Sequence, residues 1–477
     1  MPRSVRSFTA DINGHRIHKP NLNGHSNMKT GRKGPDNEGL FGTIMSFLNT
    51  YVAPPLVILC MPTLVMATCY LDDHHAGELL SFVKEIQDTP VGQMLLRIWN
   101  PLTKIDLVVM VTVLVYMAWA VIWMVVLPGP QVEGPMTSHG NIPVYRDNGF
   151  RHYIVTMTGS VLFTVVLKLS GSTPTFIYDR FSEFAALMNV LAVVVVFMLY
   201  IKGIYKPSTS DSGKTGKGFL FDYYWGTELY PRVFGIDIKV FTNCRFGMTV
   251  WPLLVLVFAL KSYELHGLID SMFVSSVLQL IYVSKFFIWE GGYYQTMDIV
   301  QDRAGFYICW GCLALVPPLY PIASRYLVSH PVELGPLSSA VLLIIGTVSI
   351  YVNYQADEQK TLARKTSGNC VIWGTKPDVI RAKHVLQSGK KKKSIILASG
   401  WWGVSRHFHY IPEVLLAACW TLPAGFSHFL PYAYLLFLTI LLVHRTFRDD
   451  RKCAQKYGHF WKTYCGKVRY RIIPYVF

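Results

Sequence analysis

Nearly charge-free runs of apolar residues recur from about residue 55 to residue 443. A helix that crosses the hydrocarbon core needs roughly 20 mostly apolar residues. The pattern therefore predicts an all-α integral membrane protein with about nine or ten transmembrane helices. The last two runs are short and share one apolar block, which leaves the count open by one. The runs are Leu56–Leu71, Ile105–Leu127, Tyr153–Leu169, Phe184–Ile201, Met248–Leu260, Met272–Trp289, Phe306–Leu319, Leu337–Tyr354, Val414–Phe426 and Leu430–Val443.

The composition supports this interpretation. Mean hydropathy is +0.31, and 51% of the 477 residues are hydrophobic whereas only 16% are charged. A soluble helical protein would not leave so many long runs without charge. The net charge of +16 resides mostly in loops, so we expect no nucleic-acid partner. For the lysine run Lys390–Lys393 we expect contact with anionic headgroups of the lipid bilayer.

The basic segments indicate how the chain is oriented. Lysine and arginine are concentrated before the first run, in Lys202–Arg245, in Lys360–Arg406 and at the C-terminus. With ten spans, all of these segments fall on one side, which the positive-inside rule makes the cytosolic side. We therefore expect both termini in the cytosol. Residues 1–43 are polar and predict a disordered cytosolic tail without a cleavable signal, and residues 44–477 form one membrane domain.

Neither the cysteines nor the histidines predict a metal site. The nine cysteines are scattered, several of them inside apolar runs, which argues against a disulfide framework. Cys309 and Cys312 form a C-x-x-C pattern in a hydrophobic helix with no second pair. His407 and His409 flank a phenylalanine without nearby carboxylates. We expect no bound metal.

The polar segment Gln355–Pro412 interrupts the apolar pattern. Its start continues the preceding helix into the cytosol, which places Lys360 and Arg364 four residues apart on one helix face. Two extended segments, Asp378–Leu386 and Ser394–Ser399, are joined by a turn at Gly389–Lys393. The chain has no G-x-G-x-x-G between a strand and a helix, so loops and helix ends must bind any nucleotide.

Two patches rich in rings and cations follow, at Ser399–Tyr410 and His444–Gly458. They suit a phosphate-bearing aromatic cofactor that reacts with a lipid. The arginines and lysines can bind phosphates, the rings can stack on a base, and Asp449 can accept hydrogen bonds from a ribose or carboxamide. A positive-inside girdle with an aromatic belt explains the same residues equally well. The candidates are Lys360, Arg364, Arg406, Arg448 and Arg451 for phosphate, and Trp402, Tyr410, Tyr457 and Tyr464 for stacking.

Carboxylates also follow the apolar run Met272–Trp289. Glu290 comes directly after it, and Tyr293, Tyr294 and Asp298 follow. A carboxyl group half-buried among rings has a raised pKa and can deliver a proton. The alternative is that these side chains reach interfacial water and have no chemical role.

Several long motifs resemble one family. They are G-T-E-L-Y-P-R at 226–232, L-A-S-G-W-W-G-V-S-R-H-F-H-Y at 397–410, H-R-T-F-R-D-D-R-K-C-A-Q-K-Y-G at 444–458 and Y-R-I-I-P at 470–474. From about Asp222 to Phe477 the chain resembles the sterol reductases, the group that contains 7-dehydrocholesterol reductase, sterol carbon-14 reductase and the membrane part of the lamin B receptor. D-I-K-V-F-T-N-C-R-F-G-M at 237–248 and K-F-F-I-W-E-G-G-Y-Y-Q-T-M-D-I at 285–299 look most like the plant-type 7-dehydrocholesterol reductase branch.

Three positions depart from the wider family pattern. His409 stands where many members have asparagine, Pro412-Glu413 replaces a usual Gly-Asp, and Tyr230 stands where asparagine is common. The plant-like branch shares these changes. They bear on the subfamily, and His409 puts the detail of one cofactor contact in doubt.

The resemblance implies an NADPH-dependent reductase of the endoplasmic reticulum membrane, acting on a sterol held between spans of the C-terminal half. It also implies association with other membrane enzymes of the sterol pathway. Matched position by position, the family's cofactor-binding residues fall on Lys360, Arg364, Leu397, Trp402, His409, Tyr410, Asp449, Cys453, Ala454, Gln455, Lys456, Tyr457 and Tyr464.

The chemistry of such a reduction requires an acid. Hydride addition to an isolated ring alkene is unfavourable, whereas protonation followed by hydride capture avoids a carbanion. A 5,7-diene sterol would give an allylic cation, which rings can stabilise. We expect Glu290, with Tyr282 or Asp298, to relay the proton in reduction of the carbon 7 to 8 double bond. The alternatives are a carbon-14 double-bond reductase and a non-catalytic sterol-binding membrane protein.

Overall fold

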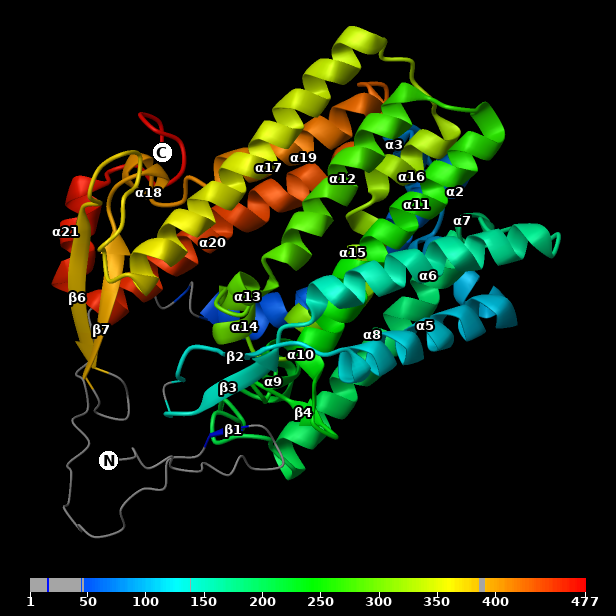
Figure 1. Cartoon of the computed structure of the whole chain (residues 1–477). Coiled ribbons are helices and arrows are strands. Elements are labelled where there is room, and N and C mark those ends of the chain that lie inside the picture. Colours follow the sequence, from blue (N-terminus) through cyan, green and yellow to red (C-terminus); the bar gives the residue numbers. More distant parts are fainter. Residues whose placement is uncertain (1–14, 17–43, 45–46, 138, 386–390) are drawn as a thin grey trace.

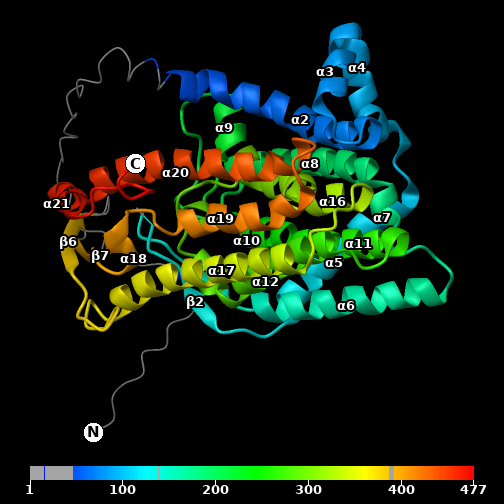
Figure 2. The same cartoon turned by 90° about the horizontal axis from the view of Figure 1, so that it is seen from above.

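The computed structural model describes residues 15–16, 44, 47–137, 139–385 and 391–477. Helices dominate this part of the chain, and Figures 1 and 2 show them gathered side by side into one bundle. The tail predicted for residues 1–43 lies almost wholly outside the described residues, so its disorder stays a prediction.

Within the described residues, nine helices are long and apolar enough to cross a membrane, and Tyr410–Ala424 is a shorter apolar helix. These ten helices overlap the ten charge-poor runs, so the predicted all-α, multi-pass architecture is confirmed. The ambiguity at the end of the chain is resolved as one short helix followed by one long helix. The long helices are Leu48–His75, Leu107–Val126, Gly149–Leu169, Phe181–Tyr205, Ile238–His266, Asp270–Ile288, Phe306–Ser329, Pro336–Lys365 and Leu430–Tyr457.

Four of the long helices are composite. Prolines contribute to this, because they lack the N–H that continues an α-helical ladder, and Pro317 and Pro318 lie where one span changes from π to α geometry. The composite helices are η1 (Leu48–Val52) with α2 (Ala53–His75); α10 (Ile238–Val240), η3 (Phe241–Gly247) and α11 (Met248–His266); η4 (Phe306–Leu315), α15 (Val316–Leu319) and α16 (Ile322–Ser329); and η6 (Leu430–Tyr432) with α20 (Ala433–Tyr457).

The other long helices are regular. They are α5 (Leu107–Val126), α6 (Gly149–Leu169), α8 (Phe181–Tyr205), α12 (Asp270–Ile288) and α17 (Pro336–Lys365). The prediction that the helix before the polar interruption continues past residue 355 is confirmed, because α17 runs to Lys365 and includes Lys360 and Arg364. The short apolar helix consists of α19 (Tyr410–Thr421) and η5 (Leu422–Ala424), and α19 packs against α12, α17 and α20.

Short elements connect these helices. Two small antiparallel sheets lie in the loops, one ordered β1-β3-β2 and one pairing β4 with β5. Their bounds are His15–Arg16 for β1, Gln131–Glu133 for β2, Ile142–Arg146 for β3, Arg232–Val233 for β4 and Ile236–Asp237 for β5. The short helices are α3 (Leu79–Asp88), α4 (Val91–Trp99), η2 (Asn100–Lys104), α7 (Phe176–Asp179), α9 (Phe219–Trp225), α13 (Glu290–Tyr293), α14 (Met297–Val300), α18 (Trp401–Val404) and α21 (His459–Lys467).

A β-ribbon fills the polar interruption. Strands β6 (Val379–Val385) and β7 (Lys391–Leu397) pair antiparallel, with Val379 opposite Leu397. The two predicted extended segments are thus confirmed, although β7 begins three residues earlier than expected. Alternate residues of the ribbon point inward and pack on α21 and the end of α20, where they form a cluster of Ile380, Ala382, Ile396, Tyr457, Trp461, Tyr464 and Val468.

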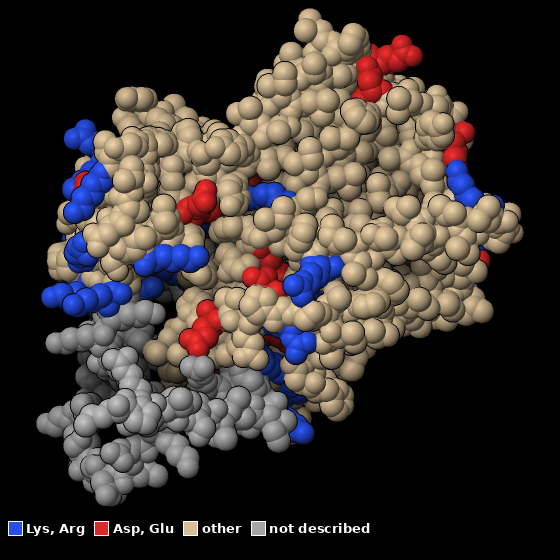
Figure 3. All heavy atoms as spheres, in the orientation of Figure 1, with Lys and Arg blue, Asp and Glu red and all other residues tan. Residues whose placement is uncertain are grey.

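The ribbon, α18, α21 and the C-terminus all lie at one end of the bundle (Figures 1 and 2). Lysine and arginine side chains gather over this end, whereas the flank of the bundle is largely uncharged (Figure 3). This separation is what the positive-inside pattern requires of a multi-pass membrane protein. We call this end the polar end.

Candidate active site

Trp402 is the centre of the site at the polar end. Its side chain is only 8% exposed, and its indole N–H donates to the carbonyl oxygen of Ala356 at 2.6 Å. The Lys360 ammonium lies 4.1 Å from the centroid of the ring. The Tyr464 hydroxyl donates to the Trp402 carbonyl at 3.1 Å. Helix α17, helix α21 and the loop after β7 therefore meet at one tryptophan, and Leu397 belongs to the same buried cluster.

A row of rings leads from Trp402 to α20. The ring of His409 lies 4.9 Å from that of Trp402 and 4.3 Å from that of Tyr410. Tyr410 in turn stacks on His407 at 5.2 Å with 9° between the planes. His407 Nε2 is 3.9 Å from a carboxylate oxygen of Asp449. The same carboxylate accepts the thiol of Cys453 at 3.6 Å.

The two histidines of this row are held neutral by burial. Loss of hydration lowers the pKa of His407, and loss of hydration together with the nearby Lys360 charge lowers the pKa of His409 well below its ordinary value. Neutral imidazoles keep one donor and one acceptor each. The pair can therefore form hydrogen bonds with an uncharged polar group.

The site also contains buried polar atoms that lack a hydrogen-bond partner within the described structure. Five of them fall in the segment 401–409: Trp401 Nε1, Ser405 Oγ, Arg406 Nε, His407 Nε2 and His409 Nδ1. Native proteins seldom leave such atoms unpaired, because an unsatisfied buried group costs about 1–3 kcal/mol. Donors, acceptors, cations and ring faces in one place fit a nicotinamide dinucleotide, whose phosphates, amide and bases need all four.

The remaining predicted cofactor residues lie at the edge of this cluster. Arg364 is exposed one turn beyond Lys360. Ala454, Gln455 and Lys456 are exposed on the last turn of α20, and Tyr457 packs between α20, β6 and α21. The structure thus brings Lys360, Leu397, Trp402, His409, Tyr410, Asp449, Cys453 and Tyr464 together. Of the other five, Arg364, Ala454, Gln455 and Lys456 are exposed at the surface, and Tyr457 is buried in the neighbouring cluster.

A second polar cluster lies next to this site, between helices α12, α17 and α19. The hydroxyl of Tyr282 on α12 donates to Oε1 of Glu413 on α19. The other oxygen of Glu413 accepts from Asn353 of α17 at 2.8 Å, and Asn353 also donates to the carbonyl of His409 at 3.0 Å. Lys285, one turn after Tyr282, donates to Asn353 Oδ1 at 2.6 Å. His409 therefore connects this cluster to the row of rings at the polar end.

Aromatic side chains surround Tyr282. The rings of Trp251 and Trp420 lie 5.7 Å and 5.6 Å from its own ring. Tyr434 is 5.8 Å from Trp420, and Tyr320 is 4.7 Å from Tyr434. We call these five residues the aromatic cage. Its ring faces suit a transient cation, because the negative face of each π system attracts positive charge.

Glu290 lies in a separate cluster, together with Arg245. Its side chain is 0% exposed rather than half-buried. Both of its oxygens accept from the Arg245 guanidinium, one of them at 3.0 Å, and the Tyr294 hydroxyl donates to it at 2.8 Å. Arg245 also donates to Asn148 at 2.9 Å. The carboxylate is thus fully engaged in a bidentate ion pair.

Asp298 is engaged in a third place. It accepts from Arg445, and the next turn of α20 repeats the pattern with Arg448 and Asp302. These two pairs fasten α20, which carries Asp449, to α14 and the segment that follows it. Of the three residues expected to relay a proton, only Tyr282 belongs to the aromatic cage.

The sequence interpretation missed Glu413, Asn353 and Lys285 as site residues. Each lies inside or next to an apolar run, where a charged or amide side chain is costly unless it is paired. Glu413 had been noted only as a departure from the family pattern. A charged or amide side chain next to or inside an apolar run is the signal that could have identified all three.

Comparisons with known proteins identify the family. Residues 40–477 match the model of the Ergosterol biosynthesis ERG4/ERG24 family. The chain belongs to this family. It is 44% identical to a 7-dehydrocholesterol reductase of Arabidopsis thaliana over 437 residues, which are 91% of this chain and 99% of the relative.

Other ERG4/ERG24 relatives match over a smaller share. A 7-dehydrocholesterol reductase of Xenopus laevis is 37% identical over 72% of this chain and 73% of its own. A Delta(14)-sterol reductase of Schizosaccharomyces pombe is 34% identical over 72% of this chain and 78% of its own. Both reductase types therefore match, and the plant 7-dehydrocholesterol reductase matches over more of the chain and at higher identity.

Proposed function

We propose that this protein reduces the carbon 7 to 8 double bond of 5,7-diene sterols with NADPH. The observation that carries the proposal is the connection of the two clusters. Tyr282 of the aromatic cage bonds Glu413, and Asn353 links Glu413 to His409 beside Trp402. An acid in an apolar, ring-lined place adjoins a site suited to a dinucleotide. The similarity to the plant 7-dehydrocholesterol reductase supports the same substrate.

The cofactor residues have distinct roles in this proposal. Lys360, Arg364 and Arg406 would bind phosphates, including the 2′-phosphate that distinguishes NADPH from NADH. Trp402 and Tyr410 would contact ring systems, and Asp449 would accept from a ribose or the carboxamide. The residues of the last turn of α20, together with Tyr464, which bonds the Trp402 carbonyl, would cover the outer side of the bound cofactor. When bound, NADPH supplies the hydride.

The Tyr282–Glu413 pair is the proposed proton source. Its proton adds to carbon 8 of the diene, which leaves an allylic cation over carbons 5 to 7, and hydride at carbon 7 then gives the 5-ene. Tyr282 can pass its proton to the sterol and take one from Glu413 when Glu413 enters the cycle as the carboxylic acid. Asn353 and Lys285 fix the orientation of Glu413.

Glu290 and Asp298 then have a positioning role. The Arg245–Glu290 pair joins η3 to the start of α13, which directly follows α12, the helix that carries Tyr282. The Arg445–Asp298 pair fastens α20, which carries Asp449. Both ion pairs therefore hold in place helices that carry reacting or binding groups, and neither pair contacts the proposed substrate.

The test is to supply the purified protein with NADPH and, separately, a 5,7-diene sterol and an 8,14-diene sterol. We expect reduction of the 5,7-diene. The second candidate, carbon-14 reduction, is favoured by the similarity to the yeast Delta(14)-sterol reductase, and reduction of the 8,14-diene alone would establish it. Binding of sterol without turnover of either would establish the non-catalytic alternative.

We also propose that the protein resides in the endoplasmic reticulum membrane with both termini in the cytosol. The basic polar end supports this orientation (Figure 3). A glycosylation acceptor site appended to the C-terminus should stay unmodified in microsomes. Modification of that site would reverse the orientation.

A further inference from the structure

The helical hairpin α3–α4 lies at the end of the bundle opposite the polar end. It follows α2 directly, and Figure 2 shows both helices projecting sideways from the bundle, crosswise to the long helices. In that view the hairpin does not extend beyond the ends of α6 and α11. Its level along the bundle is therefore that of the outer turns of the membrane-spanning helices. The proposed reductase function gives this hairpin no role.

The two faces of the hairpin differ in character. Its outer face carries Leu79, Leu80, Val83 and Ile86 from α3 and Val91, Leu95 and Leu96 from α4. Three of these are largely exposed: Leu80 at 71%, Val91 at 76% and Leu96 at 74%. A soluble surface scatters such residues singly, whereas a continuous apolar face indicates contact with a membrane or a partner.

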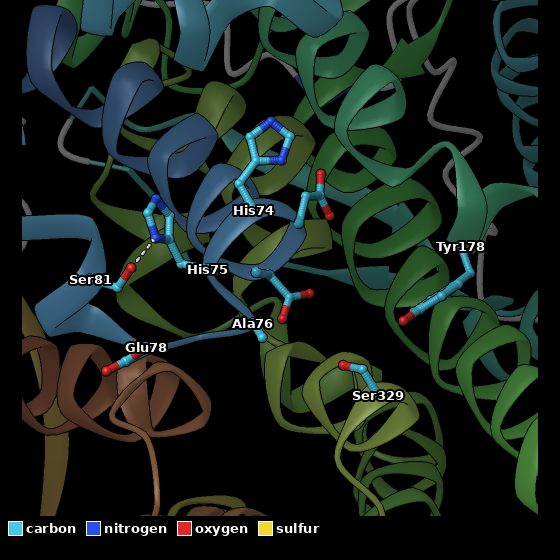
Figure 4. A pocket seen from close by; sticks show the side chains of 9 residues that line it. His74, His75, Ala76, Glu78, Ser81, Tyr178 and Ser329 are labelled. Carbon is cyan, nitrogen blue, oxygen red and sulfur yellow. Dashed lines mark hydrogen bonds between the residues drawn. The ribbon is translucent and has the colours of Figure 1, made fainter. Parts of the chain in front are cut away.

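The opposite face of the hairpin is polar. A cavity of about 620 Å³ separates α2 and α3 from α7 and α16. Figure 4 shows His74, Glu78, Ser81, Tyr178 and Ser329 around it, with a hydrogen bond between His75 and Ser81. The apolar face is thus turned away from the protein rather than toward an internal site.

A single carboxylate fixes this orientation. Glu85 of α3 accepts from Tyr70 at 2.9 Å, from His75 at 2.7 Å and from Arg97 of α4 at 2.5 Å. Phe82 and Met94 are buried beneath it. The hairpin is consequently bonded to α2 through its polar side, and it cannot rotate to hide its leucines without breaking the two bonds from Tyr70 and His75.

The hairpin directly follows a membrane-spanning helix whose outer side is apolar. Helix α2 presents Leu56, Leu59 and Leu64 to the outside of the bundle, and lipid must cover them because α2 is a membrane-spanning helix. An amphipathic helix with one apolar and one polar face rests at the boundary of headgroups and acyl chains, about 5–10 Å deep. The level and direction of the hairpin match that position.

We propose that the outer face of the α3–α4 hairpin inserts into the bilayer leaflet at the end opposite the polar end. Its occupant is the lipid of that leaflet, with the leucines among the upper acyl carbons. Glu78 and Ser81, on the cavity side of the hairpin, meet headgroups or water. The hairpin thereby anchors the sterol reductase sideways, beyond the circumference of the spans.

The experiment uses the full-length protein in phosphatidylcholine vesicles. A fluorescent non-natural amino acid replaces Leu80, or Glu78 as the control on the cavity side of the same hairpin. We expect lipids with a nitroxide on an upper acyl carbon to quench the probe at position 80 several-fold more than the probe at position 78. Aqueous iodide should show the reverse order.

A probe at position 80 that iodide quenches as strongly as the probe at position 78 would overturn the proposal, because the apolar face would then be in water. Protection from both quenchers would overturn it as well, because another protein or a second copy would then cover the face. Position 96 on α4 provides an independent probe if the variant at position 80 does not fold. Retained sterol reduction confirms that each labelled protein is intact.

Discussion

Removing the hydroxyl of Tyr282 should abolish most of the turnover and leave cofactor binding intact. Tyr282→Phe keeps the ring in the aromatic cage, so it removes only the O–H that bonds Glu413. Proton transfer by a positioned side chain contributes roughly 10²–10⁴-fold to a rate. That range corresponds to about 3–5 kcal/mol of the activation barrier.

Besides the loss of turnover, Tyr282→Phe should also lower stability. Without the tyrosine, Glu413 Oε1 loses its hydrogen bond inside the bundle, which costs about 1–3 kcal/mol of stability. The thermal midpoint should therefore fall moderately, and this fall can be measured apart from catalysis. Glu413→Gln should lose a similar factor in rate. The double variant should be little worse than either single one, because residues that act as a unit are not additive.

The assay is single-turnover reduction of 7-dehydrocholesterol at saturating NADPH, with the sterols separated by mass spectrometry. Tyr434→Phe is the matched control, because Tyr434 belongs to the same cage and contributes its ring. We expect that control within about threefold of the parent, since the acid pair stays complete. Were Tyr282→Phe to retain a third of the parent rate, the proton source would lie elsewhere.

Three further changes test the rest of the site. Lys360→Ala should raise the dissociation constant for NADPH by roughly 10–100-fold, which corresponds to the loss of one hydrogen bond to a charged group. The control Lys365→Ala should leave this constant unchanged. Equal effects of Lys360→Ala on NADH and NADPH binding would exclude a contact with the 2′-phosphate. Arg245→Ala or Glu290→Gln should lower the free energy of unfolding by about 3–5 kcal/mol, because each leaves a buried charged partner unpaired. Replacing both residues with methionine should lower it less. Thermal unfolding of the three variants measures the difference. Burial holds the pKa of His409 well below its ordinary value, so near pH 6.5 this histidine takes up a proton only in the unfolded chain. The free energy of unfolding should therefore be constant above that pH and fall below it, by up to about 1.4 kcal/mol per pH unit for this group. His409→Asn should weaken the fall between pH 7 and 5, and an unchanged pH profile would contradict the assignment.

The sequence predicts those features whose causes are local. Charge-free runs identify the spans because lipid excludes charge along the whole of each helix. The two extended segments predict the β6–β7 ribbon, although Lys391–Lys393, expected in the turn, belong to β7, and the rest of the predicted turn lies outside the described residues. The motif around Trp402 and His409 brings its rings together because they are close in the chain, and α17 delivers Lys360 by simple continuation of a helix.

Features that depend on how spans pack could not be predicted in this way. Tyr282 and Glu413 are 131 residues apart, and Arg245 and Glu290 are 45 apart. Their pairing follows from helix packing, which no local pattern encodes. The α3–α4 hairpin was missed for a different reason, because its charges are balanced and its apolar residues recur only at helical spacing over short lengths.

The most direct measurement uses NADPH deuterated at carbon 4 of the nicotinamide. Purified protein is incubated with it and 7-dehydrocholesterol, and the product is analysed by mass spectrometry and NMR. The proposed reaction predicts a 5-ene sterol with one deuterium at carbon 7 and a solvent proton at carbon 8. Unchanged diene, together with reduction of an 8,14-diene under the same conditions, would contradict it.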